Sequence, residues 1–93
     1  NDPVALTSCY ELSGMGLRVP ADISVVGRDD TDPLLDSEGL NTLTSIRFDM
    51  AEMGRLAARM IIAEVEGRGE TPANGTVLPA TLMTRGTTSP PKA

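Results

Sequence analysis

The N-terminal part of the chain has its apolar residues at the spacing of an amphipathic α-helix. Asp2 followed by Pro3 is typical of an N-cap and a first helical position. Apolar side chains then recur at helical spacing until Gly14 and Gly16, where we expect the helix to end. The positions that define this pattern are Val4, Ala5, Leu6, Cys9, Tyr10 and Leu12.

A clearer helical pattern begins at Asp49. Asp49 and Glu52 have the spacing of a capping box, in which the first side chain accepts a hydrogen bond from the backbone three residues later. Gly67 and Gly69 are expected to end this helix, and the polar residues 67–75 to form a turn. One stripe of the helix carries its apolar side chains: Met50, Met53, Leu56, Ala57, Met60, Ile61 and Val65.

Three short segments have the pattern of β-strands. Residues 23–26 are a short apolar run, and Gly27 lets the backbone leave it tightly. Residues 43–47 mix apolar side chains with residues that strands tolerate. Residues 77–83 form the last expected strand, and Pro79 interrupts it. Because proline cannot donate a ladder hydrogen bond, Pro79 marks an edge or a crossover.

The order of these elements predicts an α/β fold. Residues 30–35, between the first two strands, are expected to form one helical turn. The chain then reads helix, strand, helical turn, strand, helix, strand, and this alternation is typical of α/β architecture. Three strands with two full helices make a thin sheet whose two faces both need cover. The pattern therefore indicates a chain that is incomplete or that borrows surface from a partner.

Composition and charge argue against several kinds of function for this segment. The net charge is −5, whereas phosphate binding needs clustered Lys and Arg, so we expect no contact with nucleic acid here. The sequence has no histidine and a single cysteine, Cys9. Thiolate or imidazole metal sites and an intrachain disulfide are therefore not expected. A serine nucleophile would have no base, so we expect no catalytic residue, no cofactor and no enzymatic activity.

The chain also lacks membrane and export signals. No apolar run approaches the roughly 20 residues that a membrane-spanning helix needs. The N-terminal residues have no signal peptide features. We therefore expect no contact with a membrane.

Four stretches, taken in this order and with these gaps, resemble the LacI/GalR family of transcriptional regulators. They are ND-x-x-AL from Asn1 to Leu6, GLRVPADISVVGRDD at residues 16–30, LTSIRFDMAEMGRLAARMII at residues 43–62, and LPATLMTRGTT at residues 78–88. Each stretch alone is a weak signal. Together they cover nearly the whole chain and are specific.

The resemblance implies a fragment of a periplasmic-binding-protein-like (type I) domain, which has two lobes and a mostly parallel sheet flanked by helices. Residues 1–46 and 80–88 would belong to the C-terminal lobe and residues 47–79 to the N-terminal lobe. Residues 89–93 are expected to be a loose tail. The family's helix-turn-helix headpiece is absent from these 93 residues, so DNA would be contacted only through that headpiece.

The resemblance also implies a small-molecule effector, expected to be a sugar or a nucleoside-like compound. Its contacts would be Asn1, Asp29, Phe48 and Met50. Asp29 follows the first predicted strand, and ligands of open α/β sheets bind at the carboxyl ends of strands. A carboxylate there can accept hydrogen bonds from two sugar hydroxyls, and an asparagine both donates and accepts. Phe48 and Met50 would form an apolar wall where the chain crosses between lobes.

Each of these assignments has an alternative. Asp29 and Asp30 would otherwise cap the following helical turn, and we assign Asp30 mainly to that role. Phe48 and Met50 would otherwise be ordinary core residues. Arg28 stands where the family usually has an aromatic residue. A guanidinium beside the pocket would bind an acidic ligand or would point into solvent. Its presence argues against a plain neutral sugar as the effector.

The resemblance finally implies a homodimer built from two elements with an isologous contact. One is a stripe of the first helix, and the other is the turn after Asp30, where adjacent exposed leucines need cover. The residues of this expected interface are Leu6, Cys9, Tyr10, Ser13, Pro33, Leu34 and Leu35. The alternative is that Leu6 and Tyr10 pack on the chain's own sheet.

These features together predict the effector-sensing and dimerisation part of a cytoplasmic LacI-type regulator. Effector binding would favour one lobe arrangement and so change how the DNA-binding headpieces are presented. The alternative is a sugar-binding protein of a transport system, which shares the fold. Such a protein is exported and monomeric, so the predicted dimer surface favours the regulator.

Overall fold

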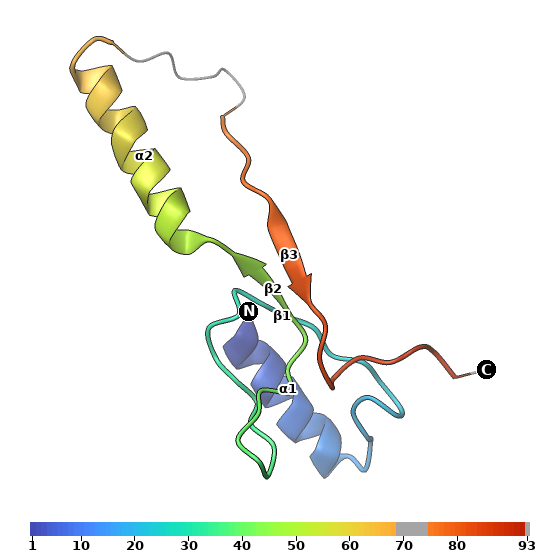
Figure 1. Cartoon of the computed structure of the whole chain (residues 1–93). Helices are drawn as coiled ribbons and strands as arrows, with labels where there is room; N and C mark the ends of the chain where they lie inside the picture. Colours follow the sequence, from blue (N-terminus) through green and yellow to red (C-terminus); the bar gives the residue numbers. More distant parts are fainter. Residues whose placement is uncertain (69–74, 93) are drawn as a thin grey trace. The chain divides into compact units, whose positions relative to one another are not determined.

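The computed structural model describes residues 1–68 and 75–92 (Figure 1). In order, the elements are α1 (Asp2–Gly14), β1 (Gly27–Arg28), β2 (Ser45–Phe48), α2 (Met50–Val65) and β3 (Ala80–Met83). The predicted α/β class is confirmed by this alternation. Gly69, most of the polar turn predicted at 67–75, and Ala93 of the predicted tail lie outside the described residues.

The strands form one sheet in the order β1-β2-β3. β1 and β2 are parallel, with Gly27 opposite Ser45 and Arg28 opposite Ile46. β2 and β3 run in opposite directions (Figure 1). The sheet is therefore mixed, and its parallel pair brings the carboxyl end of β1 beside β2.

The chain divides into two compact units. Unit 1 consists of Asn1–Arg47 and Thr81–Ala93, and unit 2 is the intervening Phe48–Ala80. The sequence predicts a change of lobe near residues 46 and 80, close to these boundaries. That the two units belong to two lobes of a larger domain remains a prediction.

The cap of α1 differs from the sequence prediction by one residue. Asn1 is the N-cap, and its Oδ1 accepts a hydrogen bond from the backbone N of Val4 at 3.2 Å. Asp2, predicted to be the cap, is instead the first helical residue and is completely buried. The prediction was wrong because the carboxylate of Asp2 is used by distant segments, as described below. The helix ends at Gly14 as predicted.

The first strand also differs from the prediction. Residues 23–26 are not a strand, and the side chains of Ile23 and Val26 are 42% and 50% exposed. Both backbone groups of Val25 bond to Thr87 instead. The N of Val25 donates to the carbonyl of Thr87 at 2.9 Å, and its carbonyl accepts from the Thr87 hydroxyl at 2.8 Å. The strand that does form, β1, begins at Gly27.

The helical turn predicted at residues 30–35 does not form. Leu35 makes an antiparallel bridge with Asn41, and the carboxylate of Asp36 accepts hydrogen bonds from the backbone N of Glu38 and of Leu40. The side chain of Asn41 accepts from the backbone N of Leu34. Side-chain acceptors therefore satisfy the backbone donors of this loop, which removes the need for a helical turn.

The core of unit 1 is rich in hydroxyl groups. Leu43, Thr44 and Ser45 are buried next to one another, together with Asp2 and Ala5. Thr87 is 3% exposed and bonds to two other segments. Besides its bonds to Val25, its backbone N donates to the carbonyl of Thr42, and its hydroxyl accepts from the backbone N of Thr44. β3 begins directly after Pro79, in agreement with the break that proline imposes on the strand predicted at 77–83.

Helix α2 in unit 2 has the predicted ends. Asp49 is its N-cap and accepts from the backbone N of Glu52 at 2.9 Å. The helix stops at Val65, and Gly67 follows with a φ of +68°, a value that glycine adopts readily. None of the helix residues is buried. Thr76 and Leu78 line one hollow together with four residues of its apolar stripe, so this stripe is only partly covered within the described part of the chain.

Two residues of the predicted loose tail are held in place. The backbone N of Ser89 donates to the hydroxyl of Ser24 at 3.1 Å, and the Ser89 hydroxyl donates to the carbonyl of Pro20. The ammonium of Lys92 lies 2.5 Å from the carboxylate of Asp22. The described part of the tail is therefore bound to the segment that precedes β1.

Candidate functional site

The turn that follows β1 has an unusual backbone. Asp29 has a φ of +96° and Asp30 a φ of +55°, and these are the non-glycine residues with positive φ among those described. Residues other than glycine rarely adopt such angles, and strained backbone of this kind clusters at functional sites. The backbone N of Asp29 donates to the carbonyl of Ile46 at 2.8 Å, and the N of Asp30 donates to the hydroxyl of Ser45 at 3.1 Å. Bonds to β2 therefore fix this Asp29–Asp30 turn.

The carboxylate of Asp29 remains accessible. Its side chain is 21% exposed, and its ion pair joins Oδ1 to Nη1 of Arg28 at 3.6 Å. That distance is too long for a hydrogen bond, so the carboxylate still has its acceptor capacity. It can accept hydrogen bonds from hydroxyl or amine groups of a ligand.

A buried carboxylate lies beneath this turn. Oδ2 of Asp2 accepts from the backbone N of Thr31 at 2.8 Å and of Asp32 at 3.3 Å, while Oδ1 accepts from the Ser45 hydroxyl at 2.6 Å. Burial raises the pKa of Asp2, but the bonds from Ser45, Asp32 and Thr31 outweigh it, so the pKa lies below its usual value. Asp2 therefore stays ionised and holds the N-terminus of α1 against residues 31–32, which follow the turn.

Asp30 does not cap a helix, contrary to the sequence prediction. Arg85 donates to both of its carboxylate oxygens, at 2.7 and 3.2 Å, and Arg47 donates to Oδ2 through Nε at 2.8 Å. The hydrogen bond from Arg85 is the largest influence and lowers the pKa of Asp30. Burial opposes this shift, and Arg47 reinforces it. The side chain of Asp30 is 5% exposed and stays charged because two guanidinium groups contact it.

The remaining predicted ligand residues are placed as follows. Asn1 is exposed and uses its side-chain oxygen to cap α1. Phe48 is the half-buried last residue of β2, and Met50 is the 48% exposed first residue of α2. Both belong to unit 2. A contact of Phe48 or Met50 with a ligand remains a prediction.

Three of the predicted dimer residues, two on α1 and one in the loop after Asp30, line the same hollow. Cys9, Ser13 and Leu34 line one hollow of about 500 Å³ in unit 1, together with Leu17, Arg18, Val19, Thr42, Gly86 and Thr87. Tyr10 and Leu35 are 78% and 59% exposed, Pro33 is exposed, and Leu6 is half-buried. The exposure of Tyr10 argues against the alternative that it packs on the chain's own sheet.

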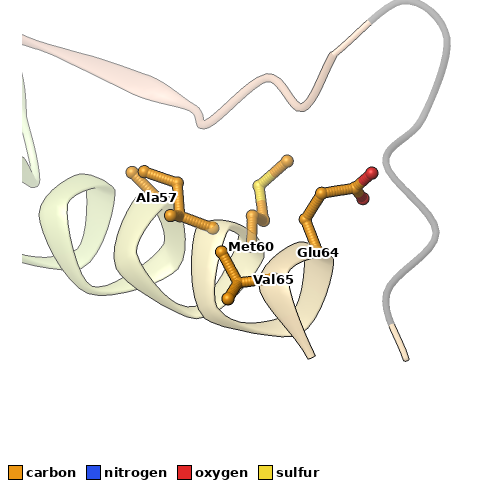
Figure 2. Close-up of a pocket in the computed structure, with 5 residues that line it drawn as sticks. Ala57, Met60, Glu64 and Val65 are labelled. Carbon is orange, nitrogen blue, oxygen red and sulfur yellow. The ribbon is translucent and has the colours of Figure 1, made fainter. Parts of the chain in front are cut away.

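A second hollow, of about 380 Å³, lies along α2 (Figure 2). Its lining residues Ala57, Met60, Ile61, Glu64 and Val65 repeat at helical spacing on one helix. Figure 2 shows Ala57, Met60, Glu64 and Val65 along that single helix. A hollow made by one face of one helix offers no opposing wall, so we interpret it as an uncovered part of the apolar stripe and not as a ligand site.

Sequence reasoning missed three residues that organise the turn: Asp2, Arg47 and Arg85. Their partners lie between 17 and 55 positions away in the sequence, and no local pattern reveals such pairs. Within residues 1–68 and 75–92, no group of three His, Cys, Asp or Glu side chains is arranged to hold a metal ion. No helix among them is long and apolar enough to cross a bilayer.

Residues 1–88 match the family model of the periplasmic binding protein-like domain. The lactose operon repressor of Escherichia coli is 35% identical over 91 residues, which are 98% of this chain and 24% of that protein. The arabinose metabolism transcriptional repressor of Geobacillus stearothermophilus is 35% identical over 88 residues, or 95% of this chain and 24% of the repressor. The chain thus spans about a quarter of these relatives.

Solved structures of Lac repressors also match this chain. A dimeric Lac repressor with an 11-residue C-terminal deletion matches with a TM-score of 0.80 and 35% identity, covering 99% of this chain and 32% of that one. A Lac repressor dimer bound to operator and the anti-inducer ONPF matches with a TM-score of 0.73 and 33% identity, covering 95% and 29%. These matches extend over both units of the chain.

Proposed function

Because the chain belongs to the family of periplasmic binding protein-like domains, as found in LacI-type repressors, we propose that it senses an effector and mediates dimerisation in a transcriptional regulator. Relatives that match nearly its whole length are named as transcriptional repressors or regulators, and none of these names is that of an enzyme. DNA would be bound by a headpiece outside these residues, because this segment carries a net charge of −5. We infer from this role that the protein acts in the cytoplasm.

The observation that carries this proposal is the Asp29–Asp30 turn. It follows the carboxyl end of β1, where open α/β sheets bind their ligands. It holds a strained backbone and presents a carboxylate with acceptor capacity to spare. We propose that Asp29 accepts hydrogen bonds from hydroxyls of a sugar or a nucleoside-like effector, with Asn1 nearby and with Phe48 and Met50 as apolar contacts.

The effector class is inferred from chemistry and from the relatives together. Vicinal hydroxyls suit a carboxylate, because each can donate one hydrogen bond to it. The relatives include repressors named for lactose and arabinose. Arg28, 60% exposed beside Asp29, adds a positive charge that would favour a sugar carrying an acidic group over a neutral one.

The experiment that tests this function uses the full-length protein and its operator. DNA binding is measured by fluorescence anisotropy while neutral sugars, sugar acids and nucleosides are added one at a time. We expect one of these compounds to change operator affinity by a factor on the order of 10 to 100, the usual size of allosteric coupling. Operator binding that no compound alters would contradict the sensing function. A protein without operator affinity would favour the transport alternative.

The dimer surface makes a separate prediction. Tyr10→Glu places a charge on the exposed stripe of α1, and in an isologous contact the change occurs twice. We expect the dissociation constant of the full-length dimer to rise at least about tenfold, as for loss of an aromatic anchor. Sedimentation equilibrium measures it.

Val4→Glu is the matched control, because Val4 is 63% exposed on the same helix and lies about 120° around the helix axis from Tyr10. It should leave the dimer intact. Equal effects of the two variants, or none from Tyr10→Glu, would refute the assignment of this surface.

A further inference from the structure

Asp30 connects three parts of unit 1 that are distant in the sequence. It lies in the turn after β1, Arg47 lies on β2, and Arg85 follows β3. Arg47 is the last residue of unit 1 before the chain enters unit 2, and Arg85 comes shortly after the chain returns at Thr81. One carboxylate therefore bonds to the chain near the point where it leaves unit 1 and again near the point where it re-enters.

The geometry of this cluster is specific. Arg85 meets Asp30 with both terminal nitrogens and uses Nη1 again on the carbonyl of Leu43 at 2.7 Å. Its backbone N donates to the Thr44 hydroxyl at 2.8 Å. The Arg85 side chain is 19% exposed, so water competes weakly for these bonds. Two-pronged contacts of this kind fix orientation as well as distance.

The same cluster constrains Asp29. The carboxylate of Asp30 meets both arginines while Asp29 and Asp30 have positive φ angles, and the direction of a side chain depends on the backbone angles around it. Positive φ values at two successive aspartates are costly, so this backbone persists only because surrounding contacts hold it. Arg47 and Arg85 supply the charged part of those contacts.

We propose that Asp30, Arg47 and Arg85 form a clamp that positions the carboxylate of Asp29 for its ligand and ties that position to both connections between units 1 and 2. Asp30 is a positioning residue and does not itself contact the ligand. A ligand that pulls on Asp29 would shift the clamp, and the clamp would shift the connecting strands. The ligand part of this inference rests on the function proposed above, whereas the control of the turn does not.

The test uses amide hydrogen exchange on the full-length protein without ligand. In Asp30→Asn, we expect the amides of Asp29 and Asp30 to exchange about tenfold faster, as for one lost hydrogen bond to a charged group. The amides of α1 should keep their rates. If Asp30→Asn does not fold, Arg47→Gln replaces it in the test. This variant removes one cationic partner of Asp30, and it should disturb the fold less because the Arg47 side chain is 53% exposed.

Asp22→Asn is the matched control. Asp22 also has two cationic partners, Arg18 and Lys92, in the same unit but away from the turn. It should leave exchange at Asp29 unchanged. If the amides of the turn exchange at wild-type rates in Asp30→Asn, the clamp does not hold the turn and the proposal is wrong. Faster exchange throughout unit 1, including α1, would also contradict it, because that pattern shows general destabilisation.

Sugar binding then separates the two proposals. The probe is whichever compound of the operator screen changes DNA affinity, and calorimetry measures its dissociation constant. A roughly tenfold weaker constant in Asp30→Asn and an unchanged one in Asp22→Asn support the clamp. Equal constants in the wild type and Asp30→Asn refute it and leave the sensing function standing. If no compound binds the wild type, the sensing function is contradicted. The amide exchange rates alone then show whether Asp30 holds the turn.

Discussion

Gly27→Ala is expected to destabilise unit 1 severely. A Cβ atom at this position would lie 2.2 Å from Oδ1 of Asp2 and 3.2 Å from Cδ2 of Leu43. Neither neighbour can move easily, because both side chains are fully buried and the carboxylate is held by three hydrogen bonds. We expect the free energy of unfolding to fall by about 3 kcal/mol, the upper part of the range for overpacked cores. Urea denaturation of the full-length protein, followed by circular dichroism, measures this change.

Gly54→Ala is the control for the glycine substitution itself. Gly54 lies inside α2, and nothing lies within 4 Å of the place where its Cβ would be. Alanine should stabilise that helix by up to about 1 kcal/mol.

The double variant Asp2→Ala with Gly27→Ala should lower the free energy of unfolding by less than the sum of the two single changes, because removing the carboxylate makes room for the methyl group. Strictly additive costs would show that the close approach of Gly27 to Asp2 does not limit stability.

Asp29→Ala is expected to abolish the effector response and to leave operator binding intact. The carboxylate would lose hydrogen bonds to two ligand hydroxyls, each worth about 1.5 kcal/mol or more, so affinity should fall on the order of 100-fold. Operator binding should survive, because this acidic segment is not expected to touch DNA. Fluorescence anisotropy with labelled operator, with and without the active compound, measures both properties.

A second variant removes an ambiguity in this experiment. Alanine is strained at the φ of +96° that Asp29 adopts, whereas glycine is not. Asp29→Gly therefore deletes the carboxylate without opposing the backbone. If the glycine variant keeps wild-type affinity, the loss in Asp29→Ala comes from backbone strain, and the ligand role of the carboxylate is rejected.

The sequence predicts the ends of α2 well, because the signals there are local. The Asp49 cap and the left-handed Gly67 both act within one helical turn of the ends of the helix. Asp29 does follow a strand, as predicted, but that strand is Gly27–Arg28 and not the apolar run at 23–26 from which it was predicted. Local pattern is sufficient wherever the partner of a residue is a near neighbour in the chain.

Predictions failed where the partner is distant. Asp2 looks like a cap next to a proline, but Ser45 and the 31–32 backbone take its carboxylate, and Asn1 caps the helix instead. Asp30 looks like a cap for a helical turn, but Arg85, 55 residues later, holds it. The run at 23–26 looks like a buried strand, yet Val25 bonds to Thr87. The contacts of Asp30 and Val25 exist only once residues 85–88 lie against the start of the sheet, and those of Asp2 only once α1 lies against residues 31–32 and 45, which no short window of sequence shows.

The central claim is that the carboxylate of Asp29 directly holds hydroxyls of a small polar ligand, and a double-mutant cycle between protein and ligand tests it most directly. Calorimetry would give the dissociation constants of the active compound and of its singly deoxygenated analogues for the wild type and for Asp29→Gly. We expect one analogue to bind the wild type about tenfold more weakly than the parent compound, and to bind Asp29→Gly as well as the parent does, because the hydroxyl has no carboxylate left to meet. Fully additive losses for every analogue would contradict the claim.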